Sequence, residues 1–209
     1  MNPDDLRAAV AIAMVMIGVG IAAVLMRRYG RKLLEKLGPA FDFGTCRRVG
    51  LFGLFGLGVE GLYRGFTCRY SIEPASQHNP GGASLRLAVN GSGRWSAEVA
   101  GAGTRLMVRM GVLKDLESGD PDLDQRLRLT ADDENGLRSL FGADHVRAAF
   151  RVVLATENFA RVRCRADRME VRWSPRDRRL DEDGEVVRSR LEAVAGLAAA
   201  CGYAPRMDS

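Results

Sequence analysis

Leu6 to Met26 reads LRAAVAIAMVMIGVGIAAVLM, and its single charge, Arg7, lies at the edge of the stretch. An α-helix rises about 1.5 Å per residue, so about 20 apolar residues cover the roughly 30 Å of a hydrocarbon core. Backbone polar groups in lipid must bond within their own segment, which favours a helix. The stretch therefore predicts a transmembrane helix over residues 6–26 that anchors the chain to a lipid bilayer.

Basic residues follow this stretch, whereas the charged side chains of the first five residues are acidic. A cleaved signal peptide would instead begin with basic residues. Lysine and arginine concentrate on the cytoplasmic side of membrane helices, so we expect residues 1–5 outside and residues 27–209 in the cytoplasm. This predicts a single-pass protein of the inner (cytoplasmic) membrane. The basic residues expected at the membrane surface are Arg27, Arg28, Arg31, Lys32 and Lys36.

Residues 27–48 are expected to form a basic amphipathic juxtamembrane segment and a linker. Leu33, Leu34 and Leu37 fall at helical spacing between charges, a pattern typical of helices at the headgroup level. Gly38 and Pro39 then end the helix. A plain stop-transfer flank explains the same charges.

The remaining residues, 49–209, are enough for one ordinary domain whose hydrophobic core needs no disulfide bonds to be stable. The chain has a net charge of +5, and its arginines far outnumber its lysines, which a compositional bias also explains. Its four cysteines, Cys46, Cys68, Cys164 and Cys201, are widely spaced and do not form the close pairs of a zinc site. We expect reduced thiols in a cytoplasmic domain.

Alternating apolar residues predict several strands, and 3.6-residue spacing predicts helices after them. Arg64-Gly65 is expected to turn one hairpin, and Gly91-Ser92-Gly93 is expected to turn the next. Residues 159–165 and 169–173 are expected to form a last hairpin. A last helix from about Asp183 presents an apolar stripe that must pack on the sheet. The pattern predicts an α+β fold, a mainly antiparallel sheet with helices packed on one face. The expected strands are 59–63, 66–72, 84–89, 95–99, 104–110, 125–130, 159–165 and 169–173.

Val49 to Leu62, VGLFGLFGLGVEGL, is an apolar, glycine-rich run at the start of the domain. Residues 56–61 match GxGxxG, but no helix is expected after them, so we assign no dinucleotide or other cofactor. The run fits a buried strand with close backbone packing, or an apolar surface for a partner or the membrane. The side chains assigned to such a surface are Leu51, Phe52, Leu54, Phe55 and Leu57.

Arginines occupy the positions opposite the apolar ones on nearly every expected strand. Like charges directly opposite each other on neighbouring strands repel. Guanidinium groups form bidentate hydrogen bonds with carboxylates and phosphates, so this face favours an anionic partner. A solvated face balanced by acidic loops is the alternative. Exposed aromatic residues for base stacking are not evident, which disfavours nucleic acid. The arginines are Arg69, Arg86, Arg105, Arg109, Arg126, Arg128, Arg161, Arg163, Arg165 and Arg172.

Local spacing assembles no catalytic constellation. The two histidines, His78 and His145, have no nucleophile placed with them in the sequence. The stretch 120–124, DPDLD, resembles the start of a calcium loop but lacks the glycine at its sixth position and the glutamate at its twelfth. We therefore assign no catalytic or metal-binding residue, and the sequence favours a non-enzymatic role.

Two short motifs resemble a family of uncharacterised bacterial membrane-anchored proteins. Residues 61–65, GLYRG, match that family's G-x-Y-R-G hairpin, and residues 118–124, SGDPDLD, match its later (S/T)-G-D-x-x-(F/L)-D element. The similarity covers roughly residues 59–173, and Leu123 stands where the family more often has phenylalanine. The resemblance implies one α+β domain tethered to a membrane, and it supplies no activity and no catalytic residue.

Together these patterns predict a membrane-tethered accessory subunit that binds other membrane-protein subunits through its basic sheet face and its apolar run. One alternative is a membrane-anchored enzyme or small-ligand-binding domain whose site forms only in three dimensions. A second alternative is a module that binds anionic lipid.

Overall fold

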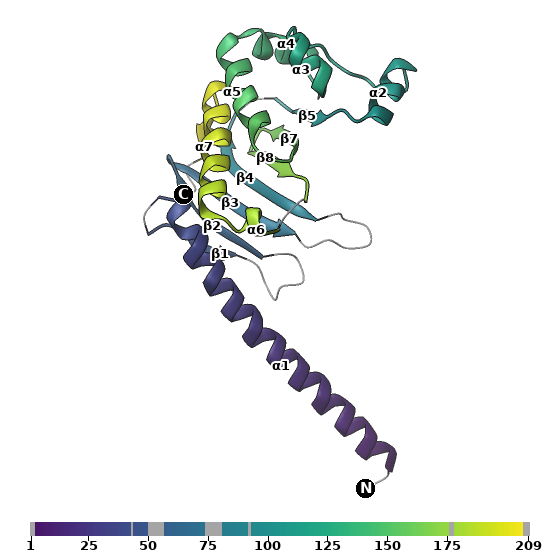
Figure 1. The fold of residues 1–209 in the computed structure, drawn as a ribbon, viewed down its shortest axis with the longest axis vertical. Helices are drawn as coiled ribbons and strands as arrows, with labels where there is room; N and C mark the ends of the chain where they lie inside the picture. Colours follow the sequence, from purple (N-terminus) through teal and green to yellow (C-terminus); the bar gives the residue numbers. More distant parts are fainter. Residues whose placement is uncertain are drawn as a thin grey trace.

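The computed structural model describes residues 3–42, 44–49, 57–73, 81–91, 93–175 and 178–206. A long helix, α1 (Pro3–Leu37), leads through a short 3-10 turn, η1 (Gly38–Ala40), into a mixed α+β domain (Figure 1). The other helices are α2 (Ala102–Arg109), α3 (Pro121–Arg126), α4 (Glu134–Gly142), α5 (Asp144–Ala155), α6 (Arg178–Asp181) and α7 (Gly184–Ala200).

The strands described in the domain form one antiparallel sheet in the order β1-β2-β3-β4-β8-β7-β5-β6, with the short β9 paired to β4. The expected α+β class with a mainly antiparallel sheet is therefore confirmed. The strands are β1 (Arg47–Val49), β2 (Leu57–Tyr63), β3 (Phe66–Glu73), β4 (Gly82–Asn90), β5 (Trp95–Val99), β6 (Leu127–Ala131), β7 (Phe159–Arg165), β8 (Arg168–Trp173) and β9 (Ala204–Pro205).

Two expected hairpins are present and one is not. Arg64 and Gly65 turn β2 into β3 with positive φ angles of 50° and 82°, as a two-residue hairpin turn requires. The β7–β8 hairpin also forms as expected. The expected pairing of β4 with β5 is wrong, because the β7–β8 hairpin inserts between them and β5 pairs with β7 and β6.

Two expected strands contain helical residues instead. Residues 104–110 were expected as a strand, but α2 covers most of them. Leu106 and Met110 satisfy both a two-residue and a four-residue period, and the run is rich in good helix formers. The expected strand 125–130 begins only at Leu127, because Asp120 and Pro121 start helix α3 just before it.

The alternation of side chains gives the sheet one buried face and one open face. On β3, Cys68 and Tyr70 are buried, whereas Arg69 between them is exposed. Helices α5 and α7 pack on the buried face, as expected (Figure 1). Trp95, Phe141 and Phe150 hold α4 and α5 to β5, with ring centroids between 5.4 and 6.3 Å apart.

A buried charge links helix α7 to the middle of the sheet. The Arg190 side chain is 2% exposed, and its Nη1 donates to Tyr70 Oη on β3 and to Asp181 Oδ1 on α6, each at 2.7 Å. Its guanidinium also lies over the Trp173 ring on β8, 4.6 Å from the centroid. Burial raises the pKa of Tyr70, so its hydroxyl stays protonated and donates to the Asp181 carbonyl oxygen at 3.2 Å.

The end of α1 belongs to the core of the domain. Leu33 and Leu37 are almost fully buried, and Tyr29 donates a hydrogen bond to Glu182 after α6. A Cβ at Gly184 would lie 2.7 Å from the Lys36 carbonyl oxygen, so α7 begins in close contact with α1. The leucines expected at the membrane surface therefore pack mainly into the protein, and this part of α1 joins the helix to the domain.

The part of α1 that precedes this joint carries exposed large apolar side chains from Ile12 to Leu25. Among the described residues, no helix has the length and apolar character that crossing a membrane requires. The transmembrane helix over residues 6–26 therefore stays a prediction.

The glycines of β2 allow close backbone approach. A Cβ at Gly58 would lie 2.8 Å from the Tyr70 carbonyl oxygen, and one at Gly61 would lie 3.0 Å from Phe41 Cδ1. The GxGxxG match therefore lies largely inside a tightly packed strand, as the close-packing interpretation predicted. The apolar contact residues Leu51, Phe52, Leu54 and Phe55 lie outside the described residues, as does the side chain of Leu57.

Replacement of Arg190 tests the buried network. We expect Arg190→Met to lower the free energy of unfolding by about 3–5 kcal/mol, because Asp181 would keep a buried, unpaired charge. Urea unfolding of the full chain in detergent measures this loss. Arg188→Met, an exposed position two residues away on α7, should change the free energy by less than about 0.5 kcal/mol. Equal losses in the free energy of unfolding for the two variants would contradict the stabilising role assigned to the Arg190 network.

Candidate functional site

The open face of the sheet gathers arginines from strands that are distant in the sequence. Register aligns Arg69, Arg86, Glu170 and Arg163 in one row across four neighbouring strands. A second row joins Ser84, Arg172, Arg161, Glu98 and Arg128. We call this surface the arginine face. Its arginines are Arg69, Arg86, Arg128, Arg161, Arg163, Arg165, Arg168 and Arg172.

Three arginines that the sequence assigned to this face lie elsewhere. Arg105 and Arg109 are on helix α2, and Arg126 ends helix α3, because these segments are not strands. Conversely, Arg168 lies on the arginine face although the sequence interpretation omitted it. Extending the alternation of β8 by one residue before Met169 would have found it.

Glutamates neutralise only part of the arginine face. Arg86 pairs with Glu170 at 3.2 Å, Arg172 with Glu73 at 2.5 Å, and Arg128 with Glu98 at 2.8 Å. Within the described part of the chain, Arg69, Arg161, Arg163 and Arg165 have no carboxylate partner within 4.0 Å. An incoming anion therefore meets unpaired guanidinium groups at positions that the strands hold apart.

The surroundings of Arg161 show that the arginine face has a positive electrostatic potential. It lies directly across from Arg172 in the β7–β8 pair, and Arg163 follows two residues later on the same face. Partial burial and these two neighbouring guanidinium groups lower the pKa of Arg161 from its ordinary value. Its buried Nε has no hydrogen-bond partner among the described residues. Like charges opposite each other are unfavourable, so an anion bound here would relieve repulsion.

A hollow of about 630 Å³ opens at one end of the arginine face, between the β7–β8 turn and the ends of β5 and β6. We call it the cationic hollow. Ser96 Oγ and Thr130 Oγ1 on its lining bond to each other at 2.7 Å. Its acids are Asp132 and Asp167, and Asp167 lies 3.7 Å from Arg168. The basic residues that line it are Arg94, Arg163, Arg165 and Arg168.

The hollow offers anion binding rather than a nucleophile. Cys164 lines it, but this side chain is buried with its strand's core positions, and burial raises the pKa of its thiol well above the ordinary value. The thiol therefore stays protonated near neutral pH and is a poor nucleophile. His145 is on α5, where its Nε2 lies 3.1 Å from the Ala200 carbonyl oxygen, and His78 lies outside the described residues.

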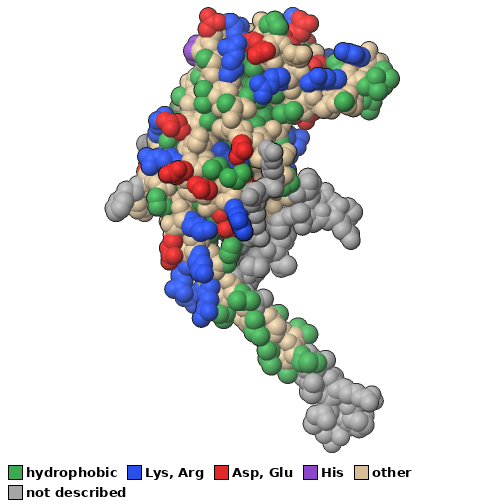
Figure 2. All heavy atoms as spheres, viewed as in Figure 1, with side chains coloured by type: hydrophobic (Ala, Val, Ile, Leu, Met, Phe, Trp, Pro, Cys, Tyr) green, Lys and Arg blue, Asp and Glu red, His purple; other side chains and the backbone are tan. Residues whose placement is uncertain are grey.

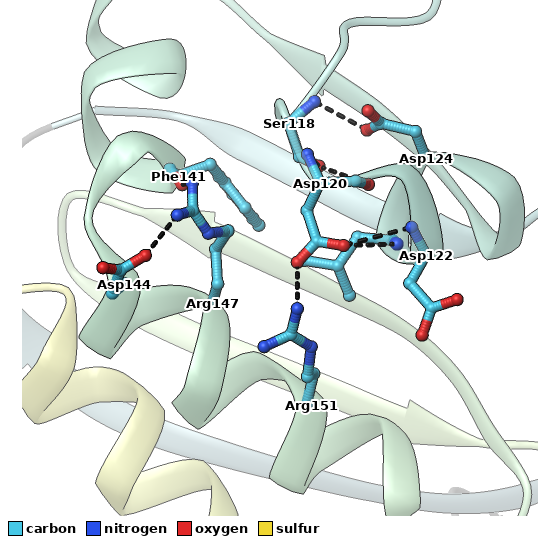
Figure 3. Close-up of polar contacts among 9 residues, drawn as sticks. Ser118, Asp120, Asp122, Asp124, Phe141, Asp144, Arg147 and Arg151 are labelled. Carbon is cyan, nitrogen blue, oxygen red and sulfur yellow. Dashed lines mark hydrogen bonds and ion pairs between the residues drawn. The ribbon is translucent and has the colours of Figure 1, made fainter.

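The SGDPDLD motif has a structural explanation. Asp120 caps helix α3 by accepting bonds from the backbone N–H groups of Asp122 and Leu123, and its other oxygen pairs with Arg151 on α5 (Figure 3). Asp124 Oδ1 accepts from the Ser118 backbone N–H at 2.6 Å. The carboxylates thus hold the α3 turn and join it to α5, and Leu123 fills the core.

The basic residues expected at a membrane surface are all exposed on α1. They cluster on the helix next to the domain, and hydrophobic side chains follow further along it (Figure 2). They are Arg27, Arg28, Arg31, Lys32 and Lys36.

No protein-family model matches this chain, and no curated protein matches it. Among solved structures, the crystal structure of the mycobacterial trehalose monomycolate transport factor A, TtfA, is similar with 12% sequence identity and a TM-score of 0.44. The alignment covers 80% of this chain and 95% of that one. A likeness at this level supports no inference about the function of this chain.

Replacement of Asp120 tests the structural role of the motif. We expect Asp120→Ala to lower the free energy of unfolding by about 1–3 kcal/mol, because α3 loses its cap and Arg151 loses its partner. Thermal or urea unfolding of the full chain measures the change. Asp122→Ala removes an exposed carboxylate from the same turn and should cost less than about 0.5 kcal/mol. A motif needed only for binding would leave both variants equally stable.

Proposed function

We propose that this chain is a membrane-tethered interaction subunit that binds an acidic surface of a membrane-protein partner on its arginine face. The observation that carries the proposal is the set of unpaired guanidinium groups on an open sheet face, ending in the cationic hollow. An acidic segment laid across the strands would meet Arg69, Arg163 and Arg165 without displacing a glutamate. Such charge complementarity provides specificity and fast association.

An acidic protein fits this face better than lipid or nucleic acid does. The pairs of Arg86, Arg172 and Arg128 with glutamates make a fixed pattern of both signs, which a protein surface can match. Anionic lipid headgroups, in contrast, bind to a basic surface without requiring a fixed arrangement of charges. The aromatic side chains of the described strands, such as Tyr70 and Trp173, lie in the core and offer no stacking platform for bases.

The tether in this proposal is the apolar stretch at residues 6–26. Exposed apolar side chains from Ile12 to Leu25 and the basic residues after them support a membrane anchor with the domain on the cytoplasmic side. Because Leu33 and Leu37 are buried in the domain, the anchor and the domain would turn as one body. The arginine face would then be presented to neighbouring membrane proteins in a restricted set of directions.

A small anionic ligand in the cationic hollow is the second candidate. The volume of about 630 Å³ is in the range of ligand sites, and the lining offers guanidinium and hydroxyl donors. This candidate predicts saturable binding of a soluble carboxylate or phosphate compound by the chain without a protein partner.

The proposed function predicts that a partner depends on the arginine face. The full chain, purified in mild detergent from the cells that produce it naturally, should carry a stoichiometric membrane protein. Arg163→Gln with Arg165→Gln should weaken this association at least about tenfold, or about 1.4 kcal/mol. Arg138→Gln with Arg188→Gln, a matched loss of two exposed charges on helices α4 and α7, should leave it unchanged. Equal retention by both double variants would contradict the proposed surface.

The proposed topology predicts that the domain is closed to reagents outside the cell. Ser189 is exposed on α7, so a Ser189→Cys variant should react with a membrane-impermeant maleimide only after the cells are opened. Burial raises the pKa of the native Cys46 thiol to about 11 and that of Cys201 to about 12, so the unmodified chain should give a low background at neutral pH. Cys164, also buried, cannot report topology. If the Ser189→Cys variant were labelled in intact cells, the domain would lie outside the cytoplasm and the proposed topology would be wrong.

A further inference from the structure

Helix α2 projects from the domain and contributes no buried side chain to it (Figure 1). Thr104 and Val108, four residues apart, are half-buried and lie on the side of α2 toward the domain. Leu106 and Met110 lie on the opposite side and are each 57% exposed, and Met107, which is 41% exposed, lies on the flank of the helix beside them. The amphipathic helix thus directs its apolar side outward, which the core of this domain does not explain.

The segment that carries this apolar side is basic or neutral, with Glu98 before it and Asp115 after Lys114. From Val99 to Leu113 the sequence contains no carboxylate, and Lys114 follows it. Arg105 and Arg109 are exposed and occupy the helix surface beside the apolar residues. Figure 2 shows hydrophobic side chains at the tip of this projection with Lys and Arg side chains next to them.

This combination matches the chemistry of an anionic bilayer surface. Helices that lie in a membrane interface insert an apolar side among the lipid chains and keep arginines at the level of the headgroups. An exposed valine, Val112, extends the apolar side beyond the helix, after Gly111 reverses the chain with a φ of 72°. A partner protein would need a matching acidic groove, whereas an anionic leaflet presents both an apolar layer and negative charge.

We infer that α2 and the turn after it, residues 102–113, form a second membrane contact that rests on the anionic leaflet holding α1. The inference depends on the proposed tether, because a short amphipathic helix binds a bilayer weakly by itself. Tethering raises its local concentration at the surface. In Figure 1, α1 descends to the lower right and α2 projects to the right from the opposite end of the domain, and the buried Leu33 and Leu37 join α1 to the domain. Two contacts would hold the arginine face at a defined orientation above the bilayer.

Tryptophan fluorescence in brominated lipid tests this contact on the full chain. The chain is reconstituted in vesicles of dibrominated phosphatidylcholine and phosphatidylglycerol, and the signal of the buried Trp95 and Trp173 in the unmodified chain is subtracted. Met110→Trp should lose at least half of its added emission relative to vesicles of unbrominated lipid. Val152→Trp on α5, a position that is also 57% exposed, is the matched control and should lose less than a tenth.

Charge and anchor variants separate the possible outcomes. Arg105→Gln with Arg109→Gln should reduce the quenching at position 110 to the level of Val152→Trp. Val15→Trp on α1 reports the anchor itself. If tryptophan at 15 is quenched and tryptophan at 110 is not, the α2 contact is wrong while the tether stands. If neither is quenched, the tether fails as well. Unquenched, blue-shifted emission at 110 that depends on protein density would show that a second copy covers α2, which also overturns the inference.

Discussion

The guanidinium group of Arg190 lies in the core, where helix α7 crosses the sheet, and side chains from several elements of the domain surround it. Removing such a charge from water is costly, so its partners must all be in place. Tyr70 comes from β3, Asp181 from α6 and Trp173 from β8, so one side chain connects segments from three parts of the chain. This requirement, together with the apolar stripe of α7, fixes α7 on one face of the sheet and leaves the opposite face to solvent.

The open face follows from the same alternation that builds the core. Each apolar residue turned toward α7 directs its neighbours to the opposite face, and on β3, β4, β6, β7 and β8 these neighbours include arginines. The β7–β8 hairpin inserts into the centre of the sheet and places Arg161 and Arg172 opposite each other. The domain thereby accepts an unfavourable concentration of positive charge on a surface that its own glutamates only partly neutralise.

Local patterns predicted the class of the fold and most of the arginine face, because a strand's period of two can be read from a single segment. They did not predict sheet order, since the insertion of β7 and β8 beside β4 is set by packing between distant segments. They mistook α2 for a strand because Leu106 and Met110 fit both periods. The burial of Leu33 and Leu37 was also missed, because an amphipathic helix has the same pattern whether protein or lipid covers it.

The most direct measurement is photo-crosslinking within native membranes from the centre of the arginine face. A photoreactive residue at Ser84, between Ser71 and Arg172, should form a discrete product with a membrane protein, whereas the same residue at Ser189 on the helical side should not. The product from Ser84 should disappear at high salt, since screening weakens contacts between charged surfaces. A product from Ser189 alone, or none from Ser84, would contradict the assignment of the arginine face as the binding surface.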